Sequence, residues 1–194
     1  MKKDIILSGV GGQGILSIAT VIGEAATAAG LFLKQAEVHG MSQRGGDVQS
    51  NLRLSTEVIY SDLIPVGSAD LIISMEPMEA LRYLPYLSRE GSVVTSSKPL
   101  VNIPDYPSQE ALLSELDSLP DVVRLDIEEA ARTCGNPKGA NMVLLGMAAP
   151  AIGILDAGEL REAIARVFAR KGEAIVAANQ KAFDLGLEAA KNRP

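Results

Sequence analysis

A short apolar segment that ends in a glycine-rich turn is the strongest constraint on how this chain folds. Residues 4–9 read DIILSG, a pattern typical of a buried strand, and residues 9–14 continue as GVGGQG. From Ile15 to Ala29 the apolar residues recur at helical spacing, and Gly30 marks the expected end of that helix. The chain therefore begins with a strand, a tight turn and a helix, which is the first half of a βαβ unit.

The rest of the chain continues this alternation of strand and helix patterns. We expect strands at residues 31–38, 48–55, 57–61, 69–75, 91–97 and 121–126. We expect helices at residues 76–88 (broken near Pro85), 128–133, 141–155, after Asp156 as a capping box with Glu159, and at 173–191. The pair at 48–55 and 57–61 reads as a hairpin-like insertion. The predicted fold is α/β, with a Rossmann-like, mostly parallel sheet, helices on both faces, and a single domain over residues 1–194.

The glycine turn matches the spacing G-x-G-x-x-G at Gly9, Gly11 and Gly14, which in this setting holds a dinucleotide pyrophosphate. A dinucleotide site also needs an acidic residue about 20 positions later for the ribose, and Glu37 is the only candidate. Two interpretations stay open at this point. The turn either binds an anion at the start of the helix, or it only permits tight packing of helix on strand.

A second unusual loop follows the expected strand at 31–38 and reads HGMSQRGG over residues 39–46. Its Arg44 stands beside two glycines whose backbone amides can form an anion-binding concavity, although a solvated loop arginine is the commoner situation. His39 is more often a structural hydrogen-bonding residue than a catalytic base. In the first loop, Gln13 carries an amide that a plain turn does not require.

Composition excludes several classes of protein. The formal net charge is −6, which argues against binding to a phosphate backbone and hence against nucleic acid. Cys134 is the only cysteine and His39 the only histidine, so the chain lacks the ligands for an iron–sulfur cluster or a paired-histidine zinc site. The longest apolar stretch, residues 142–155, is shorter than the roughly 20 residues that span a bilayer. We expect a cytoplasmic protein without metal or membrane contacts.

Taken together, the two glycine loops resemble the small γ-type component of the 2-oxoacid:ferredoxin oxidoreductases. The resemblance extends through DLIPVGSADLIISMEPMEALRYLPYL, GNPKGANMVLLG and NQKAFDLG and so covers nearly the whole chain. The segments EVHGMSQRGG and EPMEALRYLPYL are most similar to the β subunits of the indolepyruvate oxidoreductase branch, rather than to the pyruvate or 2-oxoglutarate branches. Each motif alone has low specificity for the family, but the number of motifs and their order along the chain make the match specific.

This resemblance implies a subunit of an enzyme complex that converts indolepyruvate or another arylpyruvate, with coenzyme A as co-substrate, to the aryl-acetyl-CoA, CO2 and reduced ferredoxin. It implies that thiamine diphosphate, magnesium and [4Fe-4S] clusters belong to a large α subunit, through which ferredoxin is reduced. This chain then binds no cofactor, contributes no catalytic residue and is inactive alone; a homodimer is the expected assembly of the isolated chain. The resemblance further implies that the two loops face the partner or the acyl-acceptor side, through Gly11, Gly12, Gln13, Gly14, His39, Ser42, Gln43, Arg44, Gly45 and Asn141.

Two other functions are consistent with the residues. A stand-alone NAD-binding oxidoreductase would use Gly9, Gly11, Gly14 and Glu37, and replacement of Glu37 by alanine would weaken its nicotinamide binding. A nucleotide-sensing module would bind a nucleotide without turnover. If the chain is instead a subunit of the thiamine-dependent complex, we expect the isolated chain to bind neither a nicotinamide cofactor nor another nucleotide.

The Arg44→Ala variant distinguishes a functional arginine from a solvated one. We expect the free energy of unfolding to change by less than about 0.5 kcal/mol, because an exposed arginine contributes little to folding. We expect turnover of the assembled enzyme to fall by about tenfold, the loss typical of one hydrogen bond to a charged group. Thermal unfolding of the variant and turnover of the reconstituted complex measure the two effects, and unchanged turnover would show that Arg44 is only solvated.

Overall fold

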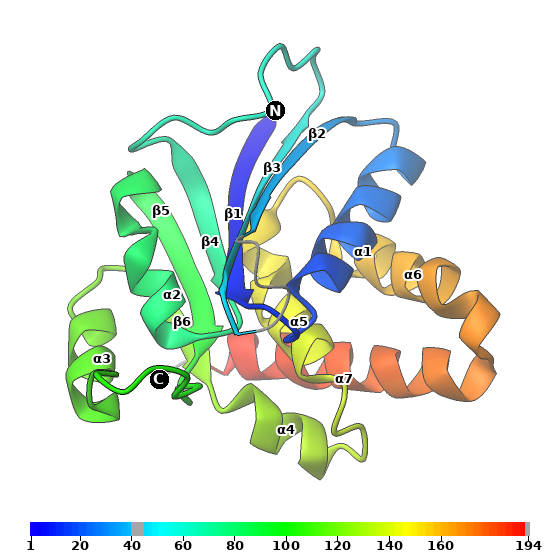
Figure 1. The fold of residues 1–194 in the computed structure, drawn as a ribbon. Helices are drawn as coiled ribbons and strands as arrows, with labels where there is room; N and C mark the ends of the chain where they lie inside the picture. Colours follow the sequence, from blue (N-terminus) through cyan, green and yellow to red (C-terminus); the bar gives the residue numbers. More distant parts are fainter. Residues whose placement is uncertain (40–44, 193–194) are drawn as a thin grey trace.

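The computed structural model describes residues 1–39 and 45–192, with His39 described by its backbone only. Six strands form one sheet in the order β2-β3-β1-β4-β5-β6 (Figure 1). The strands are β1 (Lys2–Val10), β2 (Phe32–His39), β3 (Asp47–Ser55), β4 (Ala69–Ser74), β5 (Leu87–Ser96) and β6 (Val122–Leu125).

The sheet is mostly parallel, as predicted. The neighbouring pairs β1–β4, β4–β5 and β5–β6 are parallel. Strand β3 lies between β1 and β2 and is antiparallel to both, with Ile5 opposite Leu52 and Leu33 opposite Leu54. Among the described residues, β3 is therefore the only strand that runs against the others.

The partner predicted for β3 was wrong. Residues 57–61 form no strand, and β3 instead makes a hairpin with β2, through a connection that includes the residues outside the described range. Both edges of β3 are already occupied by β1 and β2. The segment after β3 is held by side chains: Arg53 Nη1 donates to the carbonyl oxygens of Ser61 and Leu63, each at 3.0 Å, and the Ile64 N–H donates to Asn51 Oδ1.

Helices cover both faces of the sheet, as predicted (Figure 1). Ile5, Leu7 and Ile73 point into the larger core, which α1, α5, α6 and α7 complete, while Ile6 and Ile72 point into a smaller core under α2 and α3. The helices of the described chain are α1 (Ile15–Ala28), α2 (Pro77–Arg82), α3 (Gln109–Asp117), α4 (Ile127–Thr133), α5 (Ala140–Ile152), α6 (Ala157–Phe168) and α7 (Glu173–Lys191), with short 3-10 turns η1 (Leu84–Tyr86) and η2 (Ala169–Lys171).

Several local signals are confirmed. Gly30 ends the first helix region in the left-handed conformation, with φ of 71°. The helix predicted at 76–88 is interrupted before Pro85 and continues as η1. Asp156 and Glu159 form the reciprocal capping box at the start of α6. Helix α3 was not predicted, and it begins at a Ser108 cap directly after the proline-rich connection.

Helices α5 and α7 cross with their backbones in direct contact. A Cβ atom on Gly146 would lie 2.0 Å from the carbonyl oxygen of Phe183, and one on Gly186 would lie 1.9 Å from that of Val143. Helix α5 is buried along most of its length because it lies between the sheet and α7. No helix within the described ranges combines the length and apolar character needed to cross a membrane.

The Gly186→Ala variant tests this crossing. We expect a loss of about 3 kcal/mol in the free energy of unfolding, since the new methyl group can fit only if the two helices separate. The matched control is Gly23→Ala in α1, where the added Cβ meets only the flexible end of Leu33 at 3.3 Å. Alanine has a higher helix propensity than glycine, which offsets the cost of that contact. We therefore expect the free energy of unfolding of this control to change by no more than about 1 kcal/mol. Chemical denaturation measures both variants, and equal effects would contradict the close crossing.

Candidate functional site at the carboxyl ends of the strands

The two glycine loops meet at one edge of the sheet. Strands β1, β4 and β5 all end at this edge, and the register of β1 with β3 places Val10 opposite Asp47, so β3 begins here. The Gly11 N–H donates to the Gly46 carbonyl at 2.8 Å, and the Gly45 N–H donates to the Gly11 carbonyl at 3.4 Å. The glycine turn and the described end of the second loop, Gly45 and Gly46, therefore lie side by side at the carboxyl ends of the parallel strands.

The glycine turn depends on backbone conformations that favour glycine. Gly12 and Gly14 have φ of 102° and 87°, in the left-handed region. Gly14 is also the residue before the first turn of α1, and a Cβ on it would lie 2.8 Å from Asn141 Nδ2. Nothing lies within 4 Å of a Cβ placed on Gly12, so the turn is open at that position.

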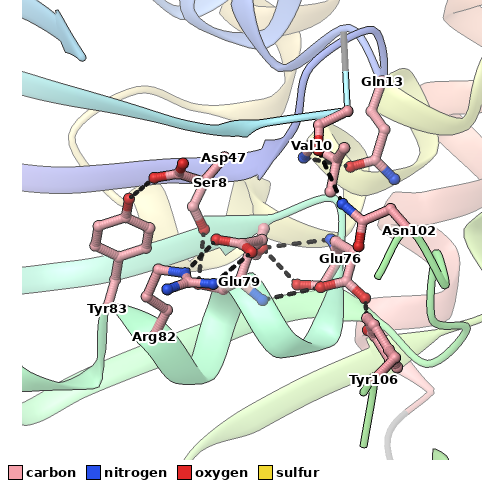
Figure 2. Close-up of polar contacts among 12 residues, drawn as sticks. Ser8, Val10, Gln13, Asp47, Glu76, Glu79, Arg82, Tyr83, Asn102 and Tyr106 are labelled. Carbon is pink, nitrogen blue, oxygen red and sulfur yellow. Dashed lines mark hydrogen bonds and ion pairs between the residues drawn. The ribbon is translucent and has the colours of Figure 1, made fainter. Parts of the chain in front are cut away.

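The Gln13 side-chain amide binds backbone groups at the ends of β1 and β4 (Figure 2). Its Oε1 accepts a hydrogen bond from the Val10 N–H at 2.8 Å, and its Nε2 donates to the Met75 carbonyl at 3.5 Å. These two contacts join the end of β1 to the end of β4. In this conformation the amide has a structural role within the turn.

Asn141 connects the start of α5 to the same turn. Its Nδ2 donates to the Gly14 carbonyl at 3.2 Å, and its side chain does not cap α5, which begins after Gly139 without a side-chain cap. Of the other predicted residues, Gly45 lies in the hairpin turn with φ of 79°. Ser42, Gln43, Arg44 and the His39 side chain lie outside the described part of the structure.

The geometry does not favour the dinucleotide interpretation. In a dinucleotide fold, the strand that carries the acidic residue lies directly beside β1. Here β3 separates β1 from β2, which places β2 about 10 Å from β1, at about 4.8 Å for each strand spacing. The exposed Glu37 accepts a hydrogen bond from Gln35 at 2.7 Å.

A group of buried polar residues beside the turn was missed by the sequence analysis (Figure 2). Glu76 is fully buried at the end of β4 and caps α2 by accepting the Glu79 N–H at 2.9 Å. Its other oxygen accepts from the Leu100 N–H at 3.2 Å and from the Tyr106 hydroxyl. This one carboxylate thus joins the helix start to the connection at residues 97–108.

The same connection also reaches the hairpin, because Asn102 Nδ2 donates to the Gly45 carbonyl at 3.0 Å. Residues 97–108 therefore form a strap across the edge of the sheet, attached at Glu76 and at Gly45. The sequence does indicate that a helix begins at Glu76, the residue that holds the strap. Proline is common at the first position of a helix, and Pro77 follows Glu76 directly. Nothing local indicated which distant groups Glu76 would bind.

The pKa values of the ionisable groups next to this strap are shifted mainly by burial. Burial raises the pKa of Glu79, and its ion pair with Arg82, at 2.8 Å, opposes that rise. Burial, together with the nearby Asp47, raises the pKa of Tyr83 to about 12. Burial and the hydrogen bond to Glu76 also raise the pKa of Tyr106. Both tyrosines are therefore neutral donors at physiological pH.

Within residues 1–39 and 45–192, no three His, Cys, Asp or Glu side chains form a group that could hold a metal ion. Cys134 is buried, as expected for a packing cysteine, and its thiol lies against the Ala131 carbonyl. The edge instead presents glycine backbone, amide side chains and the exposed apolar residues Val101 and Ile103 of the strap.

Comparison with known proteins identifies relatives along nearly the whole chain. The sequence model of the family described as pyruvate ferredoxin/flavodoxin oxidoreductase matches residues 4–189. Indolepyruvate oxidoreductase subunit IorB of Pyrococcus horikoshii is 40% identical over 98% of both chains. The 2-oxoglutarate synthase subunit KorC of Methanothermobacter thermautotrophicus is 29% identical over 84% of both chains. The crystal structure of the keto/oxoacid ferredoxin oxidoreductase gamma subunit of Geobacter sulfurreducens superposes with a TM-score of 0.71, at 26% identity, over 98% of this chain and 99% of that one.

The Tyr106→Phe variant tests the attachment of the strap. Loss of a hydrogen bond to a buried carboxylate should lower the free energy of unfolding by about 2 kcal/mol. The matched control is Tyr60→Phe, because Tyr60 is 93% exposed and its change should cost less than about 0.5 kcal/mol. Urea denaturation gives both values, and hydrogen exchange should show faster exchange in residues 97–108 of the Tyr106 variant only. Identical behaviour of the two variants would show that the Tyr106 hydroxyl does not hold the strap.

Proposed function

Because the chain belongs to the pyruvate ferredoxin/flavodoxin oxidoreductase family, we propose that it is the small γ-type subunit of an indolepyruvate:ferredoxin oxidoreductase. The observation that carries this proposal is the 40% identity to an indolepyruvate oxidoreductase subunit over 98% of both chains. The lower identity of 29% to a 2-oxoglutarate synthase subunit supports the aryl branch. The complex would convert an arylpyruvate and coenzyme A to the aryl-acetyl-CoA and CO2, and pass two electrons to ferredoxin.

In this proposal the cofactors belong to a large α subunit. Thiamine diphosphate, magnesium and [4Fe-4S] clusters there supply the decarboxylation and the electron transfer to ferredoxin. The donor set of this chain does not fit a cluster, because its one cysteine is buried and a [4Fe-4S] cluster usually needs four thiolates. The chain contributes surface and positioning to the complex.

The surface we assign to the large subunit is the carboxyl edge of the sheet, made of the glycine turn at residues 11–14, the hairpin connection at 39–46 and the strap at 97–108. Three observations support this assignment. The turn is joined to the hairpin by backbone hydrogen bonds, and the hairpin is joined to the strap by Asn102. Val101 and Ile103 of the strap are exposed, as apolar side chains at a protein interface are before assembly.

Within this surface the residues have two kinds of role. Gln13 and Asn141 are positioning residues, because their amides bind the Met75 and Gly14 carbonyls and keep the turn in place. Gly11, Gly12, Gly14 and Gly45 provide the backbone that approaches the partner or the acyl acceptor. His39, Ser42, Gln43 and Arg44 complete the surface as its polar residues. The stand-alone NAD enzyme and the nucleotide-sensing module are not favoured, since β3 separates Glu37 from β1.

The deciding experiment compares the two subunits apart and mixed. We expect the purified chain to be folded and colourless, and to show no oxoacid oxidation with NAD, ferredoxin or a viologen dye. Mixed with the large subunit, it should restore arylpyruvate- and coenzyme-A-dependent reduction of ferredoxin or viologen. The Glu37→Ala variant should restore the same rate as wild type. NAD-dependent turnover by the chain alone, or a large subunit fully active without it, would overturn the proposal.

A further inference from the structure

A pocket of about 280 Å³ lies on the helical side of the glycine turn, away from the strap. It is lined by the first turns of α1, α5 and α7, through Ser17, Asn141 and Ile175, and by the segment that connects α4 to α5. These three helices belong to the same face of the sheet in Figure 1. No step of the proposed function uses this pocket.

The charge of the pocket is opposite to that of the whole chain. Lys138 and Lys171 line it, and no described aspartate or glutamate does, although the chain has 24 acidic and 18 basic residues. Neither lysine forms an ion pair with a described residue, and the Lys171 ammonium lies 5.1 Å from the centre of the Phe168 ring. Two ammonium groups without a counter-charge at one concave site favour an anionic ligand.

Neutral donors face the same space. Asn179 lines the pocket and is 8% exposed; its Oδ1 accepts from Asn136 Nδ2 at 3.2 Å, which leaves its own Nδ2 without a partner among the described residues. The helices α1, α5 and α7 begin after Gly14, Gly139 and Gly172, and none of the three has a side-chain cap. First-turn N–H groups that no side chain caps add positive potential where the lysines already stand.

The residue types select the class of ligand. Lysine is a compact point charge that commonly binds phosphate, and among the described residues the two cationic side chains that line the pocket are both lysines. Phe168, Ile175 and Ala178 provide an apolar wall for the group that carries the anion. The volume lies near the lower end of the range for small-molecule sites, about 300 Å³, which suits a small ligand.

We propose that this pocket binds the phosphate of a phosphate monoester of about the size of a mononucleotide. Lys138, Lys171 and the Asn179 amide hold the phosphate, and Phe168 and Ile175 contact the apolar part of the ligand. The site belongs to this chain alone, so its test does not depend on whether the large subunit is the one proposed above.

The test is isothermal titration calorimetry of the full chain at low salt with four probes. 5′-AMP and phenyl phosphate should bind, while adenosine and benzoate, which share their rings but lack the phosphate, should bind at least tenfold more weakly. The double variant Lys138→Gln/Lys171→Gln should bind AMP at least tenfold more weakly than wild type. Lys181→Gln on α7, a lysine that does not line the pocket, is the matched control and should bind AMP as wild type does.

A second variant keeps the test valid if the double variant does not fold. Ala178→Leu fills the apolar wall without changing charge, and it should weaken AMP binding while leaving the unfolding midpoint unchanged. No binding of either phosphate ester at millimolar concentration, adenosine binding equal to AMP, or benzoate binding tighter than phenyl phosphate would overturn the proposal. So would a lysine variant that binds AMP normally. A double variant that fails only to assemble with the large subunit would show that the lysines bind an acidic partner surface instead.

Discussion

The placement of β3 between β1 and β2 is the constraint on which the functional edge depends. Because β3 runs against its neighbours, its first residues return to the edge where β1 ends, and the hairpin connection meets the glycine turn there. The backbone bonds between Gly11 and residues 45–46 follow from that arrangement. The same insertion moves Glu37 one strand away from β1, so a turn with dinucleotide spacing lacks the neighbour that would hold a ribose.

Two further contacts keep this edge in a defined shape. Glu76 uses a single buried carboxyl group to cap α2 and to hold the strap, and the burial of this polar group is tolerated because several donors satisfy it. On the other face, α5 places Asn141 beside the turn, where its Nδ2 donates to the Gly14 carbonyl at 3.2 Å. The turn is therefore supported from both faces of the sheet.

The molecule presents two surfaces of different chemistry on either side of that turn. The carboxyl edge carries glycine backbone and the exposed apolar residues of the strap, which suits a protein partner. The pocket behind it carries two lysines and amide donors and no acid, which suits a small anion. Asn141 lines the pocket and also binds the turn, so it is the residue that physically connects the two surfaces.

Local sequence determined most of the elements and their order, although it missed α3 and predicted a strand at residues 57–61 that does not form. The strand, glycine turn and helix at the start, the interruption before Pro85 and the capping box at Asp156 each depend on residues within a few positions of one another, and periodicity and capping chemistry report such contacts directly. The single cysteine likewise determined that the chain has too few thiolates for a cluster. Only the tertiary structure decided which strand pairs with β3, the contact of Gln13 with Met75, the donors that bind Glu76, and the pocket. Asn141 and Gly14 are 127 residues apart, and Tyr106 and Glu76 are 30 apart, so no local pattern could specify these contacts before the sheet and helices had packed.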